Sequence, residues 1–256
     1  MAAQEEKKQE TKQTILVTGA NKGIGLALCQ ILVTNKEVQV ILGCRNFSHV
    51  PQAKKDNAKK QPDNYEVVDG KNESSQTRIQ ILQNIKFKDV KNIDFVEMDV
   101  TDKDSVNKAA QQIKEKYKSI DILVNNAGMA FKGNAFDIDV VNTTLTTNYF
   151  GTVNVTEAFS PLINEGGRII FTSSRAGVLN NVVKDKKIQE QILKKDLKKE
   201  ELEAILTDFK QEVEKDKTLK DSTKFKTSAY GMSKVAMSAY SRIIASSVSD
   251  KKVFVA

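Results

Sequence analysis

The stretch "VTGANKGIG", residues 17–25, places three glycines between two different apolar segments. The run "TILVT" at 14–18 is β-branched and too short for a helix, whereas "IGLALCQILV" at 24–33 is long enough for one. We therefore predict a strand, a tight glycine turn and a helix. Such a turn lets backbone N–H groups approach a phosphate, which the positive end of the helix also attracts.

A glycine-rich turn alone is weak evidence for a phosphate site, because any strand-to-helix turn can use glycine to reach positive φ. The rest of the chain supplies the context. Further short apolar runs are "VQVILGC" (38–44), "IDFVEM" (93–98), "DILV" (121–124) and "RIIFT" (168–172). Near-continuous apolar runs predict strands buried on both faces of a parallel sheet. With helical patterns between them, they predict a doubly wound α/β sheet, the Rossmann fold.

The helix expected after the third strand shows how these elements are recognised. Thr101 and Asp104 resemble a capping box at its start. Its apolar stripe has spacings of three and four residues and consists of Val106, Ala109, Ala110, Ile113 and Tyr117. We expect this stripe to pack on the sheet.

Composition narrows the class of protein. The chain has 256 residues, a net charge of +7, 6% aromatic residues and no Trp. Its lysines at 184–220 are interleaved with Glu and Asp, as on a solvated helix, which argues against a nucleic-acid site. Cys29 and Cys44 lie in apolar contexts, so we expect no disulfide framework and no metal. We predict a cytoplasmic protein without a membrane segment.

The predicted organisation is a disordered tail at 1–12 followed by a single nucleotide-binding domain at 13–256. A polar insertion at 46–77 carries the only histidine, His49, which we expect on the surface, and a helix should follow near 78–87. A second insertion, 184–217, has apolar residues at helical spacing among charges. We interpret it as one or two amphipathic helices packed on the domain, with a partner-binding helix as the alternative.

The end of the second strand bears on the choice of nucleotide. An NAD site needs a carboxylate here for the ribose 2′-OH. This chain has instead Gly43, Cys44, Arg45 and Asn46. The guanidinium of Arg45 suits a 2′-phosphate, and Lys22 in the glycine turn adds a second cation. Each could be an ordinary surface charge, but together they predict NADPH.

Four motifs occur in the order found in one family. "TGANKGIG", "NNAG" (125–128), "TSS" (172–174) and "YGMSK" (230–234) resemble the short-chain dehydrogenase/reductases from about residue 14 to the end. "NNAGMAFK", "TSSRAGV", "SAYGMSK" and the 184–217 insertion resemble more narrowly the NADPH-dependent carbonyl reductases. The resemblance implies reduction of ketones, aldehydes or quinones, small-molecule substrates and a monomer.

Tyr230 and Lys234 are four residues apart in a predicted helix, so their side chains leave the same face. A free phenol has a pKa near 10, and a nearby ammonium favours the phenolate form. The pair is therefore suited to passing a proton to a carbonyl oxygen.

The resemblance implies roles for other residues. Ser174, with Ser173 as the alternative, would hold the substrate oxygen. Asn148 would hold a proton-relay water at a helix irregularity, unless it is only a packing residue. Asn125 would brace the sheet. The residues expected at the cofactor are Gly19, Asn21, Lys22, Gly23, Ile24, Gly25, Arg45, Asp99, Val100, Asn126, Ala127, Gly128, Tyr230 and Lys234.

Residues 252–255, "KVFV", predict the start of a sixth strand. Because the family continues with further strands, the resemblance implies a C-terminally truncated chain whose last strands are missing. Two other functions therefore stay open: a non-catalytic nucleotide-binding relic, and a basic interaction protein built on the 184–217 helices.

Overall fold

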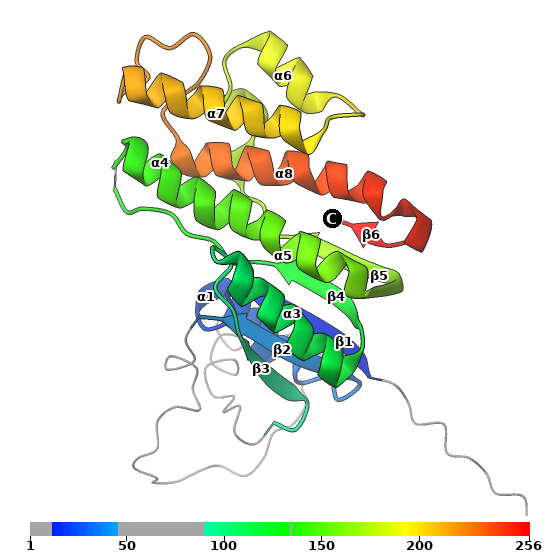
Figure 1. The fold of residues 1–256 in the computed structure, drawn as a ribbon. Coiled ribbons are helices and arrows are strands. Elements are labelled where there is room, and N and C mark those ends of the chain that lie inside the picture. Colours follow the sequence, from blue (N-terminus) through cyan, green and yellow to red (C-terminus); the bar gives the residue numbers. More distant parts are fainter. Residues whose placement is uncertain (1–11, 46–89, 134) are drawn as a thin grey trace, which may run out of the picture.

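The computed structural model describes residues 12–45, 90–133 and 135–256. The predictions for the tail at 1–11, for the 46–77 insertion with His49 and for the helix near 78–87 lie outside these residues. The described residues form a six-stranded parallel sheet in the order β3-β2-β1-β4-β5-β6 (Figure 1). The strands are β1 (Gln13–Thr18), β2 (Val38–Cys44), β3 (Ile93–Glu97), β4 (Ile120–Asn125), β5 (Ile163–Phe171) and β6 (Phe254–Val255).

This strand order confirms the predicted doubly wound sheet. The chain moves outward from β1 to β3 and then returns to add β4 beside β1. The reversal creates the position at which such sheets bind nucleotides, beyond the carboxyl ends of the strands. The glycine turn after β1 and the "NNAG" segment after β4 both lie at this position.

Helices cover both faces of the sheet (Figure 1). On one face, α1 packs with Ile15 and Val17 of β1 in one apolar cluster. Leu16 belongs to the other cluster, which contains the remaining helices. The helices are α1 (Gly23–Leu32), α3 (Lys103–Tyr117), α4 (Ile138–Leu145), the π-helix η2 (Thr146–Phe150), α5 (Gly151–Phe159), α6 (Lys186–Leu193), α7 (Lys199–Lys215) and α8 (Ala229–Ser247), with short 3₁₀ turns η3 (Ser160–Leu162), η4 (Arg175–Gly177), η5 (Leu179–Asn181) and η6 (Ser249–Lys251). None of the helices in the described ranges combines the length and apolarity that a bilayer span requires.

The predicted start of α3 was wrong by one residue. Asp102, not Thr101, caps the helix, because its carboxylate accepts from the N–H groups of Asp104 (3.0 Å) and Ser105 (3.3 Å). The hydroxyl of Thr101 donates instead to Asp99 over 2.7 Å. Two adjacent residues with capping side chains gave the sequence no means of choosing between them.

The sixth strand is shorter than predicted. Lys252 has a left-handed backbone (φ 53°), and the strand itself begins only at Phe254. The strand pairs in parallel with β5, where Arg168 faces Phe254 and Ile169 faces Val255. Within the part of the chain that the structure describes, β6 forms one edge of the sheet.

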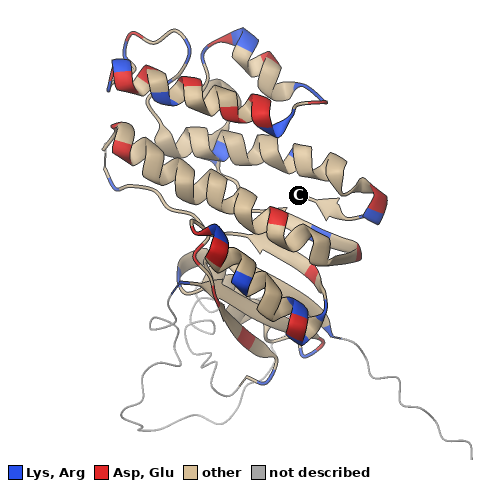
Figure 2. Cartoon of the chain, viewed as in Figure 1, with Lys and Arg blue, Asp and Glu red and all other residues tan. Residues whose placement is uncertain are grey.

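The 184–217 segment contains two amphipathic helices, α6 and α7. Helix α7 lies beside α8, and Figure 2 shows charges of both signs on its surface. Its opposite face is buried, and Phe209 packs edge-to-face against Phe225 at a centroid distance of 5.2 Å. The buried residues of α7 are Leu202, Ile205, Leu206, Phe209 and Val213.

Candidate active site

The glycine turn packs closely against the "NNAG" segment. A β-carbon on Gly19 would lie 2.8 Å from Cα of Ala127, and one on Gly25 would collide with the side-chain nitrogen of Asn126. Gly19 also has a φ of 62°, which disfavours other residues. Only glycine therefore fits at these two points, and the loops after β1 and β4 form one rigid surface.

Thr18 joins these two loops, and the sequence analysis missed it. Its hydroxyl is buried, donates to the carbonyl of Val124 (3.3 Å) and accepts from the N–H groups of Asn126 (3.0 Å) and Ala127 (2.9 Å). Asn126 donates in return to the carbonyl of Thr18 over 2.9 Å. A hydroxyl residue at the end of a buried strand, directly before the first glycine, was the available signal.

The residues predicted to select the nucleotide lie at the ends of β1, β2 and β3. The guanidinium of Arg45 lies 3.9 Å from the carboxylate of Asp99, and its side chain is 75% exposed. Lys22 and Ile24 are also exposed and flank the N-terminus of α1. Val100 is buried. Both predicted cations, Arg45 and Lys22, are thus exposed at the carboxyl ends of neighbouring strands, β2 and β1.

Tyr230 and Lys234 lie on the first turns of α8, which begins where the hydroxyl of Ser228 accepts from the N–H of Gly231 (2.9 Å). The ammonium of Lys234 lies 5.6 Å from the centre of the Tyr230 ring and donates to the carbonyl of Thr172 over 2.6 Å. Lys234 is only 4% exposed, and this burial lowers its pKa. A desolvated cation next to a half-buried phenol matches the predicted arrangement.

The two candidate serines have different partners. Ser173 shares a hydrogen bond of 2.9 Å with Ser238, two turns beyond Tyr230 on α8. Ser174 accepts from the N–H of Ala176 over 3.2 Å, which leaves its own proton available. Its turn packs directly on α8, because a β-carbon on Gly177 would lie 2.7 Å from Cβ of Lys234. The geometry favours Ser174.

Asn148 lies in the π-helix η2, so a helix irregularity does occur at this residue. Its side chain is fully buried, accepts from the N–H of Met129 and donates to the carbonyl of Met129, both over 2.8 Å. It also donates to the hydroxyl of Ser233 over 3.0 Å. Asn125 is buried and donates to Thr156 over 3.0 Å, which joins β4 to α5.

Gly128 lies close to the side chains of both Asn148 and Lys234. A β-carbon there would be 3.3 Å from the side-chain oxygen of Asn148 and 3.8 Å from the ammonium of Lys234. The "NNAG" segment, the π-helix and α8 therefore converge at one end of the predicted cofactor site.

A hollow of about 300 Å³ lies beside Tyr230. It has aromatic and small side chains and no charged residue in its lining: Phe131, Gly133, Ala135, Phe136, Val140, Thr144, Thr227, Ser228, Ala229 and Tyr230. Its volume is at the lower end of the range for small-molecule sites.

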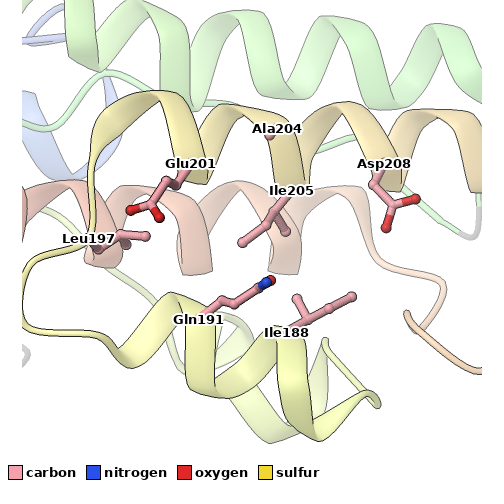
Figure 3. A pocket seen from close by; sticks show the side chains of 7 residues that line it. All are labelled: Ile188, Gln191, Leu197, Glu201, Ala204, Ile205 and Asp208. Atoms are coloured by element: carbon pink, nitrogen blue, oxygen red, sulfur yellow. The ribbon is translucent and has the colours of Figure 1, made fainter.

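A second hollow, of about 340 Å³, lies between α6 and α7 (Figure 3). Both carboxylates in its lining already have partners: Glu201 is 3.5 Å from the ammonium of Lys194, and Asp208 is 2.8 Å from that of Lys224. None of the predicted catalytic residues lines it. In the described ranges, no group of three or more His, Cys, Asp or Glu side chains is arranged to hold a metal ion.

Comparison with known proteins gives a consistent result. The family model described as "short chain dehydrogenase" matches residues 58–185. Carbonyl reductase (NADPH) 1 of Mus musculus is 29% identical over 247 residues, which cover 94% of this chain and 77% of that protein. Its counterpart in Pongo abelii is 30% identical over 240 residues, which cover 93% of this chain and 75% of that protein.

Solved structures share the fold. Menthone neomenthol reductase from Mentha piperita superposes with a TM-score of 0.71 at 26% identity, covering 93% of this chain and 86% of that one. Salutaridine reductase from Papaver somniferum gives a TM-score of 0.72 at 24% identity, and the superposition covers 95% of this chain and 84% of that one.

Proposed function

This chain belongs to the short-chain dehydrogenase family, and from that premise we propose that it reduces ketones, aldehydes or quinones to alcohols with NADPH. The observation that carries the proposal is the buried ammonium of Lys234 beside the phenol of Tyr230. A buried ammonium is costly to the fold unless a carboxylate pairs with it, and within the described residues Lys234 has only the carbonyl of Thr172 and the sulfur of Met237 as hydrogen-bond acceptors. Its place at the carboxyl ends of the strands is where the nucleotide of such a sheet binds.

The residues at the predicted cofactor site fit a dinucleotide phosphate. A β-carbon on Gly23 would meet no atom within 4 Å, so the turn is open at this point to a ligand. The turn and the N-terminus of α1 would hold the pyrophosphate. Arg45 and Lys22 would hold the 2′-phosphate, and the other residues expected at the cofactor would line the adenine and the nicotinamide ribose. When bound, NADPH supplies the hydride.

The protein's own side chains would supply the proton that the substrate oxygen takes up. Tyr230 would donate its phenolic proton to the substrate oxygen, and the ammonium of Lys234 would stabilise the phenolate that remains. The hydroxyl of Ser174 would donate a hydrogen bond to the same oxygen. Asn148 would hold the water that returns a proton to Tyr230. The uncharged hollow beside Tyr230 would seat the apolar part of the substrate.

We also propose a monomeric, cytoplasmic protein. Helix α7 packs beside α4 and α8 and covers apolar surface of these helices. A stable dimer in sedimentation, with α8 at its interface, would contradict the monomer.

The test is NADPH oxidation by the purified chain with a quinone or an aromatic ketone. We expect turnover that requires both substrate and enzyme, and loss of NADPH binding in Lys22→Glu. NADPH binding without turnover of any carbonyl compound would refute the reductase and leave a non-catalytic nucleotide-binding protein. Undetectable NADPH binding would refute both.

A further inference from the structure

Ser233 lies between Tyr230 and Lys234 in the sequence, but its side chain is completely buried. Its hydroxyl donates to the backbone carbonyl of Tyr230 over 2.8 Å and accepts from the side-chain amide of Asn148 over 3.0 Å. One buried hydroxyl therefore connects the backbone of the proposed proton donor to the π-helix.

The bond to the carbonyl of Tyr230 is by itself unremarkable, because helical serines often bond to the preceding turn. Ser241, on the same helix, makes the same kind of bond to the carbonyl of Ser238 over 2.9 Å. What distinguishes Ser233 is its second bond, to Asn148. Within the described residues, Ser241 makes no second side-chain hydrogen bond, so it is a matched control.

The amide of Asn148 has a determined orientation. Its oxygen faces the N–H of Met129, and its nitrogen faces the carbonyl of Met129 and the hydroxyl of Ser233. Turning the amide over would oppose donor to donor and acceptor to acceptor at Met129. Both of its N–H donors are thus used, and loss of the Ser233 hydroxyl would leave one of them buried without a partner.

We propose that Ser233 is a positioning residue that sets the place of Tyr230 relative to the nicotinamide end of the cofactor site. The hydrogen bonds run from Met129, next to the "NNAG" segment, through Asn148 and Ser233 to Tyr230. They join a loop, the π-helix and the catalytic helix, which are otherwise distant in sequence. This role rests on the proposed reductase function.

The kinetic test compares Ser233→Ala with Ser241→Ala. We expect Ser233→Ala to lower kcat about tenfold, because small displacements of a catalytic group are costly, while the Kd for NADPH stays within about twofold. Ser241→Ala should change neither. In a double-mutant cycle, adding Ser233→Ala to Asn148→Ala should lower kcat by less than about twofold. Equal kcat for wild type and Ser233→Ala, or additive losses in the cycle, would overturn the proposal.

A readout independent of turnover separates this proposal from the reductase function. The N–H of Met129 donates to Asn148, so its hydrogen exchange reports whether the amide is held. We expect at least about tenfold faster exchange in Ser233→Ala and an unchanged rate in Ser241→Ala, both measured well below the melting temperature of each variant so that global unfolding does not contribute. An inactive wild type would refute the reductase. Unchanged exchange in Ser233→Ala would refute the link through Ser233.

Discussion

At the nicotinamide end of the proposed cofactor site, Lys234 and Asn148 expose 4% and 0% of their surface, whereas at the 2′-phosphate end the side chain of Arg45 is 75% exposed. Lys234 and Asn148 have hydrogen-bond partners at 2.6–3.0 Å, while Arg45 has a carboxylate at 3.9 Å. The first end is desolvated and fixed before any ligand binds. The second is solvated, so a ligand must order it. Changes to the buried Lys234 and Asn148 should therefore affect chemistry and stability together, and those at the second end only cofactor affinity.

The largest effect is expected from Tyr230→Phe. Removal of the proton donor should lower kcat by roughly 10²–10⁴. The structure gives this half-buried hydroxyl no hydrogen bond within the described residues, so the melting temperature should stay within about 2 °C. Steady-state NADPH oxidation and a thermal melt test both statements. Tyr240→Phe, ten residues along the same helix, is the control and should retain wild-type kcat. Turnover by Tyr230→Phe at the wild-type rate would exclude Tyr230 as the donor.

Lys234→Met should combine a loss of kcat of roughly 10² or more with a change in pH dependence. Burial lowers the pKa of Lys234, so the folded protein binds this proton less tightly than the unfolded chain. The unfolded chain therefore holds more protons between the lowered folded pKa and about 10.4, and wild-type stability gains from this residue as the pH rises through that window. Lys234→Met should lack the gain. Urea titrations across about pH 7–10 measure it, and parallel curves for the two proteins would contradict the lowered pKa.

Arg45→Asp tests the exposed end. Charge-assisted bonds to a 2′-phosphate contribute about 1.5–3 kcal/mol, so NADPH affinity should fall by about tenfold or more and the preference over NADH should diminish. Stability should change little, since the side chain is exposed. Lys36→Asp, an exposed cation between α1 and β2, is the control and should leave both affinities unchanged. Equal wild-type affinity for NADPH and NADH would contradict the prediction.

The smallest effect is a gain in stability from Tyr240→Phe. Among the described residues, the hydroxyl of Tyr240 is buried without a hydrogen-bond partner, and burial raises the pKa of this phenol, as do Glu157 and Glu203. Removing an unsatisfied buried hydroxyl should stabilise the fold by about 1 kcal/mol. Chemical denaturation measures the difference. A destabilised variant would indicate that a water satisfies the hydroxyl and that this side of α8 is as well supported as the catalytic side.

The sequence predicted those parts of the molecule that depend on local pattern. The apolar runs gave the strands, and the four-residue spacing of Tyr230 and Lys234 gave their shared face. The sequence did not reveal the hydrogen bond from Lys234 to the carbonyl of Thr172 or the one between Asn148 and Ser233. These bonds join residues that are 62 and 85 positions apart. The predicted cap of α3 was wrong for another reason: Thr101 and Asp102 are adjacent and both are suitable caps.

The π-helix η2 has a consequence for the length of its segment. Helix α4, η2 and α5 form one continuous helix from Ile138 to Phe159, in which α4 packs on α7 and α8 while α5 packs on α3. Each α-helical residue turns the chain by about 100°, and the wide turn adds a residue without adding a full step. Deleting one residue there would restore a regular helix and leave α4 and α5 close to their present orientation, but it would move Asn148 away from Met129 and Ser233. Homologous chains that keep the contacts of Asn148 should therefore keep the length of this segment.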